Sequence, residues 1–385
     1  MTVIVRFGIL ILNIIYCALK LLPQKKKVTV ISRQSDSPSL DINMLAEKIT
    51  ALHSDYTVTV LCKKLDGGIG RKLGYCFHIL RQMYHIATSK ILVLDSYCIA
   101  ASILHHRKSL LVIQMWHSIG TMKKFGYSIL DKPEGSSSKV AHLMKMHAGY
   151  DYILAAGDGY KEHLAQGFNY PPKKIVTLPL PRVERLKDSG YKTRIINEIT
   201  AEYPELSPSG LSPTGRFPKQ NIVYVPTFRK ANDGDFLKAL AELCEAVDYE
   251  KYNLIVKAHP LTDLSGFNGG KAVIDNKFSS FDMLFIGDII ISDYSCIMYE
   301  AAVLKKPVYL YAYDYDSYMS TRDIYMDYKK EVPGPICDTA GELVKAIENA
   351  DYDFEKADAF LNKYVYMGSK HETEDIVEFM FGKRK

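Results

Sequence analysis

The stretch from Phe285 to Lys330 constrains the fold of this chain more than any other. It contains an apolar run at 289–291, apolar positions at helical spacing from 296 to 304, and a second apolar run at 307–313. The pattern predicts a strand, a tight turn, a helix and a second strand. In an open sheet, two strands joined by such a short helical crossover form a parallel βαβ unit.

Three polar residues, Ser292, Asp293 and Ser295, lie in the predicted turn. Doubly wound sheets bind ligands at the carboxyl ends of their strands, where the next helix presents unpaired N–H groups and the positive end of its dipole. The turn is therefore placed to meet an anion and the hydroxyl groups attached to it. Because Ser and Asp are also favoured helix caps, a purely structural role stays open.

Length and composition describe a folded, two-domain protein. The chain has 385 residues, of which 47% are hydrophobic and 24% charged, enough for a large core. The 49 Lys and Arg residues slightly outnumber the 44 Asp and Glu residues, which suits an anionic substrate or membrane surface and does not require nucleic acid. The seven cysteines are scattered and form no C-x-x-C pair, so we expect reduced thiols and no metal site.

The N-terminus predicts a membrane-associating helix. Residues 3–22 are strongly apolar, but Arg6, Asn13 and Lys20 recur at intervals of seven and form one polar stripe on a helix. Asn13 interrupts the apolar run that a spanning helix needs, so we expect a helix in the plane of the membrane surface, with Arg6 and Lys20 at the headgroups. Three lysines at 25–27 add attraction to anionic lipids. A single membrane span is the alternative.

Strands alternate with helices along the rest of the chain, as in parallel α/β sheets covered on both faces. The tract 204–218 is rich in Pro, Ser and Gly and predicts an irregular connection between two halves. Further predicted strands are Val28–Ser32, Tyr56–Cys62, Ile91–Leu94, Leu110–Trp116, Tyr150–Ala155, Lys174–Leu178, Asn221–Val225 and Asn253–Val256. Further predicted helices are Asp41–Leu52, Gly74–Thr88, Phe236–Ala246, Ala340–Asn349 and Glu372–Phe381.

These patterns divide the chain into four segments. Residues 1–27 are the membrane-associating helix and basic segment, and residues 28–186 and 187–365 are two Rossmann-like domains. Residues 366–385 form a C-terminal helix whose apolar spacing allows it to pack back on the first domain.

His117 lies at the carboxyl end of a predicted strand in the first half, before a Gly-containing turn and the basic pair Lys123 and Lys124. An imidazole titrates near neutral pH, so a histidine in this position is suited to general-base catalysis. A structural hydrogen-bonding role is the alternative.

Two strands of the second half also end in polar residues. Thr227 and Arg229 follow the first, and Lys257 and His259 follow the second. Arginine offers a planar fork for phosphate, and Lys and His add positive charge and a proton donor. With the turn at 292–295, three strand ends of one sheet converge and predict a phosphate site.

Six motifs, in this order, resemble the CDP-glycerol glycerophosphotransferase family of wall teichoic acid synthesis. They are QMWHSIGTMKKFG at 114–126, LPLPR at 178–182, YVPTFRK at 224–230, VKAHP at 256–260, ISDYSCIMYEAAVLKKPVYLYAYDYDSY at 291–318 and EVPGP at 331–335. The resemblance implies a GT-B fold, in which two Rossmann-like domains face a central cleft, with the acceptor on the first domain and a CDP-linked donor against the second.

The resemblance also implies roles for single residues. His117 matches the family's proposed base, and Arg229, His259, Asp293 and Ser295 match its donor-site residues. We assign to the donor side also Thr227, Lys257, Ser292, Glu300 and Asp314, and to the acceptor side Lys123, Lys124 and Arg182. The chain has Ser118-Ile119-Gly120 where the family has Gly-Thr-Pro, and Arg322-Asp323 where it has Arg-Gly, which leaves the polyol and the acceptor open.

The expected function is transfer of glycerol phosphate from CDP-glycerol to a hydroxyl of an undecaprenyl-linked acceptor, with release of CMP, at the cytoplasmic face of the cell membrane. We expect peripheral attachment and no cofactor. We assign no metal ligands, and the metal requirement stays open. Three alternatives stay open. They are a CDP-ribitol-dependent transferase, a nucleotide-sugar-dependent GT-B glycosyltransferase or epimerase, and a non-catalytic membrane-bound protein that binds nucleotide or lipid carrier.

Overall fold

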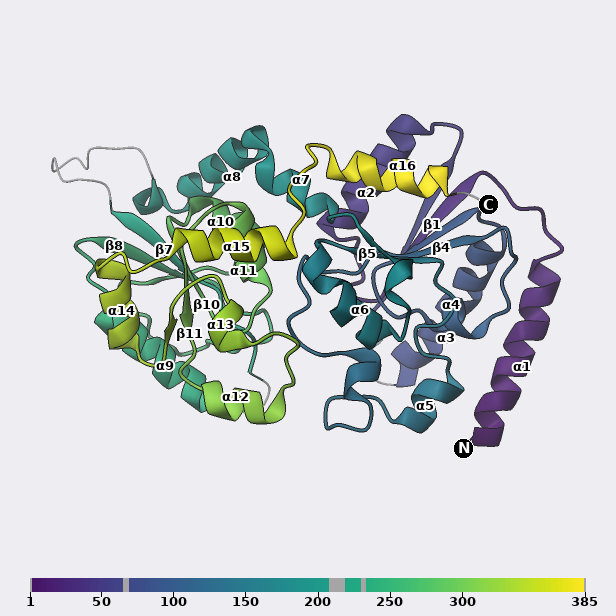
Figure 1. Ribbon diagram of the computed structural model, residues 1–385, viewed down its shortest axis with the longest axis horizontal. Helices are drawn as coiled ribbons and strands as arrows, with labels where there is room; N and C mark the ends of the chain where they lie inside the picture. The colour runs from purple at the N-terminus through teal and green to yellow at the C-terminus, as the bar shows by residue number, and fades with distance from the viewer. Residues whose placement is uncertain (1, 65–68, 208–218, 230–232, 384–385) are drawn as a thin grey trace. The chain divides into compact units, whose positions relative to one another are not determined.

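The computed structural model describes residues 2–64, 69–207, 219–229 and 233–383. The chain divides into two compact units. Unit 1 comprises residues 1–184 and 366–385, and unit 2 comprises residues 185–365 (Figure 1). Of the predicted connection at 204–218, residues 204–206 form a short 3-10 helix, and residues 208–218 lie outside the described part.

Unit 1 contains a six-stranded sheet with the order β2-β1-β3-β4-β5-β6, and every pair of neighbours is parallel. β2 lies on one side of β1 and the later strands lie on the other, so the order reverses between β1 and β3. This reversal is the point where doubly wound sheets open a ligand site. The strands confirm the predicted ones and are β1 Lys27–Ser32, β2 Thr57–Cys62, β3 Ile91–Leu94, β4 Leu111–Gln114, β5 Tyr152–Ala155 and β6 Ile175–Thr177.

The helices of unit 1 pack their apolar stripes on this sheet. Ile42 of α2 and Ile376 of α16 are fully buried in one core with Val28 and Ile91 of the sheet. α16 packs against α2, where Lys48 and Glu374 form an ion pair of 3.3 Å. The α-helices are α1 Thr2–Leu19, α2 Leu40–Leu52, α3 Ile69–Ala87, α4 Ile99–Ile103, α5 Ser138–Leu143, α6 Lys161–Phe168, α7 Pro181–Lys187, which runs into unit 2, and α16 Glu372–Gly382.

α1 is docked on unit 1 by the stripe that the sequence predicts to be polar. Asn13 is buried, donates to the carbonyl of Ile103 at 3.1 Å and accepts from the N–H of His105 at 3.0 Å. The Lys20 ammonium donates to the carbonyl of His105 at 2.8 Å. Of the two residues predicted at the headgroups, Lys20 thus contacts protein and Arg6 is exposed. In the part of the chain that the structure describes, no helix has both the length and the hydropathy needed to cross a membrane.

Unit 2 contains a second six-stranded parallel sheet, with the order β12-β11-β10-β7-β8-β9. Here the order reverses between β7 and β10. The predicted βαβ unit is confirmed as β10, α11 and β11. The strands are β7 Gln220–Tyr224, β8 Tyr252–Val256, β9 Val273–Ile274, β10 Ile289–Ser292, β11 Val308–Tyr311 and β12 Ile336–Cys337.

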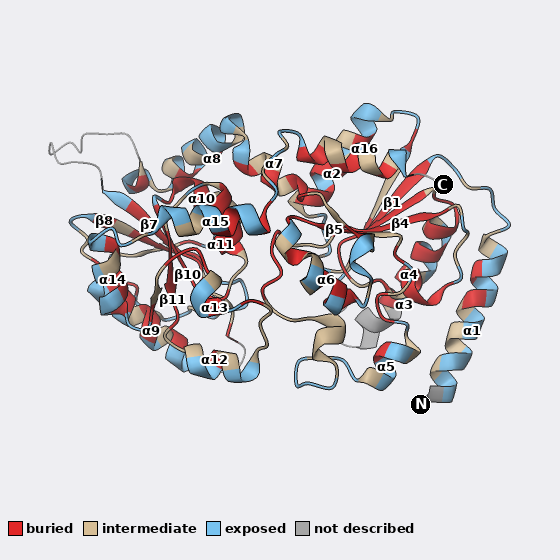
Figure 2. Cartoon of the chain, viewed as in Figure 1, coloured by how far each residue is buried: buried red, intermediate tan, exposed pale blue. Residues whose placement is uncertain are grey.

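The core of unit 2 lies between this sheet and α9 and α14, where Tyr224, Leu240, Ile291 and Leu343 are fully buried (Figure 2). α14 starts at a capping box in which Thr339 and Glu342 satisfy each other's backbone N–H groups. The helices are α8 Ser189–Glu202, α9 Asp233–Ala246, α10 Ser280–Ile286, α11 Ile297–Val303, α12 Tyr315–Thr321, α13 Tyr328–Glu331, α14 Ala340–Glu348 and α15 Phe354–Tyr364.

Candidate active site

His117 of unit 1 reaches the reversal point of its sheet. It follows β4, and its Nδ1 atom lies 3.1 Å from the backbone oxygen of Asp95, directly after β3. The same Nδ1 lies 3.3 Å from Nε2 of Gln34, shortly after β1. The side chain therefore bridges the carboxyl ends of the two strands between which the strand order reverses.

The backbone before His117 holds this position at a conformational cost. Trp116 has φ of 68°, a left-handed conformation that is unfavourable for a bulky aromatic residue. Gln114 stabilises it by accepting from the Trp116 N–H at 3.0 Å and donating to the carbonyl of Ser96 at 3.2 Å. The Trp116 ring also packs on Phe125, with ring centroids 4.5 Å apart. Such strain persists only where the surroundings over-determine it, as they do at functional sites.

Two groups compete for Nδ1 of His117. The Asp95 carbonyl at 3.1 Å can only accept, and the Gln34 amide nitrogen at 3.3 Å can only donate. The shorter contact, to the carbonyl, favours the tautomer with the proton on Nδ1 and the lone pair on Nε2. Burial lowers the pKa of His117 below its ordinary value, and the positive charge of Arg182 acts in the same direction. A neutral imidazole with a basic Nε2 is the form that a general base needs.

Arg182, predicted on the acceptor side, holds the backbone of His117 in place. Its Nε donates to Asp41 at 2.8 Å and its Nη2 donates to the same carboxylate at 2.5 Å. Nη2 also donates to the His117 carbonyl at 3.3 Å. Asp41 lies in the first turn of α2 and is only 2% exposed. Lys123 and Lys124 are half-buried in the loop after β4.

Sequence reasoning missed Gln34, Asp41 and Asp95. The sequence contained a signal that Asp95 belongs to the site, because this residue directly follows a predicted buried strand, as His117 does. For Asp41 the sequence contained no such signal, because its partner Arg182 is 141 residues away.

In unit 2, Thr227 and Asp293 form hydrogen bonds between the two loops on either side of the strand-order reversal. The N–H of Thr227, after β7, donates to both carboxylate oxygens of Asp293 at 2.9 and 3.0 Å. The Thr227 hydroxyl donates to the same carboxylate at 2.6 Å. Asp293, after β10, is fully buried. The two loops that flank the reversal point are thereby locked together.

Arg229 is paired with two carboxylates of the same unit. Its Nε and Nη2 donate to the two oxygens of Asp314 at 2.6 and 3.0 Å, and its Nη1 lies 2.9 Å from Asp293. Nη1 also donates to the Thr227 carbonyl at 2.7 Å. The two neighbouring carboxylates hold the pKa of Arg229 above its ordinary value despite its burial. The Arg229 fork, predicted for donor phosphate, is occupied by protein carboxylates.

Aromatic rings enclose this guanidinium. Its carbon lies 5.2 Å from the ring centre of Tyr294, 5.5 Å from that of Tyr313 and 5.1 Å from that of Tyr318. Tyr294 and Tyr318 stack with centroids 3.7 Å apart, and the Tyr328 hydroxyl donates to the Asp293 carbonyl at 3.0 Å. Sequence reasoning missed these tyrosines, although their density between 294 and 328 was a visible signal.

Lys257 and His259 differ in their surroundings. Lys257 is buried, and its ammonium lies 2.9 Å from the fully buried carboxylate of Asp275. His259 is exposed, and its Nδ1 accepts from the N–H of Leu261 at 3.1 Å. Because Nδ1 accepts, the neutral ring carries its proton on Nε2 and can donate there. His259 thus has the tautomer opposite to that of His117.

The remaining predicted donor residues lie close to the β10 end. The Ser292 hydroxyl donates to the Val225 carbonyl at 3.0 Å and is fully buried. Ser295 accepts from the N–H of Ile297 at 3.3 Å, so it contributes to capping α11. Glu300 is buried within α11.

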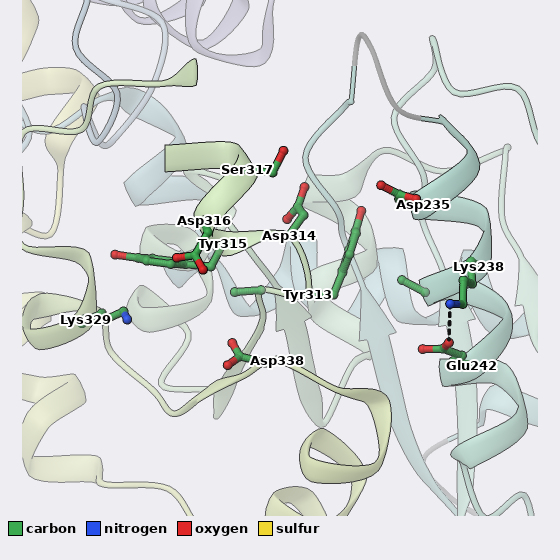
Figure 3. A pocket seen from close by; sticks show the side chains of 12 residues that line it. Asp235, Lys238, Glu242, Tyr313, Asp314, Tyr315, Asp316, Ser317, Lys329 and Asp338 are labelled. Carbon is green, nitrogen blue, oxygen red and sulfur yellow. Dashed lines mark ion pairs between the residues drawn. The ribbon is translucent and has the colours of Figure 1, made fainter. Parts of the chain in front are cut away.

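Unit 2 also contains a cavity of about 550 Å³ beside the Arg229 network (Figure 3). Asp314 and Tyr313 form part of its wall, so the cavity touches the network directly. Its carboxylates suit the hydroxyl groups of a ribose or a polyol better than a phosphate. Its charged lining residues are Asp235, Lys238, Glu242, Asp314, Asp316, Lys329 and Asp338. Over the described ranges, no group of three or more His, Cys, Asp or Glu side chains is arranged to hold a metal ion.

Comparison with known proteins defines the class of this fold and site. Residues 14–382 match the family model for CDP-Glycerol:Poly(glycerophosphate) glycerophosphotransferase. A solved structure of a variant of the wall teichoic acid polymerase TagF, soaked with CDPG, superposes with a TM-score of 0.71 at 20% identity, covering 94% of this chain and 90% of that chain. At this identity the likeness shows the fold alone, which is α/β and GT-B-like with two parallel sheets.

Two relatives refine the comparison. The chain is 31% identical over 369 residues to a teichoic acid ribitol-phosphate primase of Bacillus spizizenii, covering 94% of this chain and 92% of the relative. It is 25% identical over 319 residues to a teichoic acid glycerol-phosphate primase of Bacillus subtilis, covering 79% and 76%. The chain therefore belongs to the CDP-glycerol glycerophosphotransferase family, as its motifs predicted. This membership places it among the phosphotransferases of teichoic acid synthesis.

The Arg229 network predicts a loss of stability. Arg229→Ala leaves Asp293 and Asp314 without their shared cation, and breaking a buried pair in this way costs about 3 to 5 kcal/mol. We expect the free energy of unfolding, measured by urea titration with circular dichroism, to fall by that amount. Arg194→Ala removes an exposed pair with Glu198 and serves as the matched control, with stability close to wild type. Equal stability of the two variants would contradict the structural role.

Proposed function

We propose that this protein transfers a polyol phosphate from a CDP-activated donor to a hydroxyl of a lipid-linked acceptor and releases CMP. The acceptor oxygen attacks the phosphorus that carries the polyol, the bond to the CMP phosphate breaks, and the acceptor proton passes to a base. The observation that carries this proposal is His117, a neutral base at the reversal point of a sheet, in a chain that belongs to a glycerophosphotransferase family. The proposed place of work is the cytoplasmic face of the membrane.

Unit 1 supplies the base in this proposal. Nε2 of His117 accepts the acceptor proton while Nδ1 donates to the Asp95 carbonyl, which also stabilises the imidazolium that forms. Arg182 acts as a positioning residue, since it contacts the His117 carbonyl and is held by Asp41.

Unit 2 supplies the donor groups. His259 donates from Nε2 to a donor phosphate, which is electrostatic stabilisation by a group already in place. Arg229 shapes the loops of Thr227 and Asp293, because its fork is engaged by carboxylates. A CDP-linked donor is supported by the family and by the CDPG soak of TagF.

The polyol has two candidates. Glycerol phosphate is the expectation from the motifs. Ribitol phosphate is the second candidate, because the ribitol-phosphate primase relative is more similar to this chain, and over more of its length, than the glycerol-phosphate primase relative.

A donor comparison tests the proposal. The full chain is incubated with labelled CDP-glycerol, CDP-ribitol and UDP-sugars, with and without a lipid-linked acceptor, and release of CMP or UDP is measured. We expect acceptor-dependent CMP release from one CDP-polyol. UDP release would instead support a nucleotide-sugar enzyme on the same fold. Binding of a nucleotide without turnover would support a non-catalytic role.

The base assignment predicts a pH effect. Catalysis needs neutral His117, so kcat/KM should rise with pH through a step below the ordinary histidine value of about 6.5, because burial lowers the pKa of His117. His117→Ala should remove the step and lower turnover by about a hundredfold to ten-thousandfold while donor binding by calorimetry is kept. His259→Ala should weaken donor binding as well. A His117→Ala enzyme with wild-type rate and pH step would refute the assignment.

The positioning role of Arg182 predicts a different profile. Lysine cannot make both guanidinium contacts with Asp41 and the contact with the His117 carbonyl, so Arg182→Lys should lower kcat by about tenfold to a hundredfold through misplacement of His117. The donor KM and the pH step should stay unchanged, since the base is still present. Arg185→Lys, on the same helix and paired with Asp188 at 3.0 Å, is the control and should retain its rate. Loss of the pH step in Arg182→Lys would argue against a positioning role.

A further inference from the structure

A cavity of about 380 Å³ lies at the carboxyl end of β2 in unit 1 and is lined in part by α3. We call it the basic pocket, because Lys63, which directly follows β2, and Arg81 of α3 form part of its lining. Cations from two different elements of the fold suit an anionic ligand. The rest of the lining is Asp36, Pro38, Val60, Leu61, Cys62 and His78.

One side chain of the basic pocket is a buried histidine. His78 is 9% exposed, and its Nε2 has no hydrogen-bond partner among the described residues. A buried polar atom of this kind costs free energy unless a ligand or a water molecule meets it. The Tyr75 ring lies beside the histidine, with ring centres 5.7 Å apart. The pocket therefore contains a nitrogen that is in place to bind a ligand.

The charges of the basic pocket favour an anion. Burial lowers the pKa of His78, and the positive charges of Lys63 and Arg81 lower it further, whereas Asp36 acts in the opposite direction. Burial raises the pKa of the Cys62 thiol to about 11, so this residue adds no charge at neutral pH. The lining thus carries two cations and one carboxylate, and a phosphate oxygen in the pocket would meet both cations.

The carboxylate of the basic pocket suits hydroxyl groups of the same ligand. One oxygen of Asp36 accepts from the N–H of Lys64 at 3.0 Å, and a carboxylate has further lone pairs for other donors. Cations for a phosphate and a carboxylate for a hydroxyl are thus present together. This combination fits a polyol phosphate or a sugar phosphate better than inorganic phosphate alone.

The basic pocket lies close to the proposed base. The loop after β1 reaches both places, since Nε2 of Gln34 lies 3.3 Å from Nδ1 of His117 and Asp36 lines the pocket. β1 is also the strand between β2, where the pocket lies, and β3, after which Asp95 contacts His117. Two strand spacings amount to about 10 Å. A single extended polyol phosphate or sugar phosphate unit can span a gap of this length.

We propose that the basic pocket binds a phosphate that the acceptor already carries next to its reacting hydroxyl. Lys63, His78 and Arg81 contact the phosphate oxygens. Asp36 accepts from a hydroxyl of the same unit, which leaves the reacting hydroxyl at Nε2 of His117. The acceptor class is therefore one that ends in a polyol phosphate or a sugar phosphate. This inference rests on the proposed function, because it uses His117 as the base.

The first experiment measures binding without the transfer reaction. In the full chain with labelled histidine, the His78 ring is followed by nuclear magnetic resonance while the methyl ester of glycerol phosphate is added. We expect the His78 signals to move and the pKa of His78 to rise, because a bound anion favours the imidazolium. The methyl ether of glycerol, which lacks the phosphate, should have no effect. Unmoved His78 signals would overturn the proposal, whatever the result of the transfer assay.

Variants test the cations in the same experiment. Arg81→Gln should weaken binding of the ester about tenfold, the effect of losing one charge-assisted contact. Lys108→Gln, at an exposed lysine before β4 of the same unit, is the matched control and should bind as wild type. Equal binding by Arg81→Gln and the wild type would remove Arg81 from the site and overturn the proposal.

The second experiment tests whether the bound phosphate belongs to the acceptor. Transfer from a saturating CDP-polyol is measured with the same ester and the same ether as soluble acceptors. We expect a lower KM for the ester. Arg81→Gln should raise that KM about tenfold and leave kcat, the donor KM and the KM for the ether unchanged. Transfer with the same ester KM in Arg81→Gln and wild type would overturn this inference alone, whereas no transfer from any CDP-polyol would overturn the proposed function.

A third measurement separates the acceptor from a lipid headgroup, which is another source of phosphate. The transfer assay with the ester is repeated in the presence of phosphatidylglycerol vesicles. We expect the KM for the ester to stay the same, because the pocket takes the phosphate of the acceptor. A competitive rise in this KM that Arg81→Gln abolishes would assign the pocket to lipid headgroups and overturn the proposal.

Discussion

The buried guanidinium of Arg229 is the interaction on which the candidate site of unit 2 depends. It bridges Asp293 after β10 and Asp314 after β11 and contacts the Thr227 carbonyl after β7, so it joins the ends of three neighbouring strands. Removing ions from water is costly, and such a group is stable only where its hydrogen bonds are met. Here they are met by carboxylates and tyrosine rings. The guanidinium that the sequence predicts for a donor phosphate is therefore engaged by carboxylates of the protein in this structure.

Both units place their chemistry by the same topological rule. In each sheet the strand order reverses once, between β1 and β3 and between β7 and β10, and the helices after the flanking strands lie on opposite faces there. His117 bridges the first reversal point, and the Thr227 to Asp293 contact closes the second. The two histidines have opposite tautomers because one Nδ1 faces a carbonyl and the other faces an N–H. Backbone groups thus decide which ring accepts a proton and which one donates.

The sequence was sufficient for the strands, for the parallel βαβ unit and for the residues at strand ends, because hydrophobic runs and the residues that follow them are local features. It was insufficient for charge pairing. Arg182 and Asp41 are 141 residues apart, and Arg229 and Asp314 are 85 apart, so no local pattern connects them. The sequence alone predicts that each arginine contacts substrate, whereas in the structure each is paired with a carboxylate of the protein. His259 differs from these arginines, because its side chain is exposed.

The N-terminal helix shows that an amphipathic sequence pattern does not determine which side of a helix faces the protein. Arg6, Asn13 and Lys20 define a stripe, but a seven-residue interval does not state whether that stripe meets water, headgroups or protein. In the folded unit, Asn13 donates to the Ile103 carbonyl and accepts from the His105 N–H, so this part of the stripe meets protein. Asn13 and Lys20 therefore turn inward, whereas Arg6 and several apolar side chains of α1 are exposed.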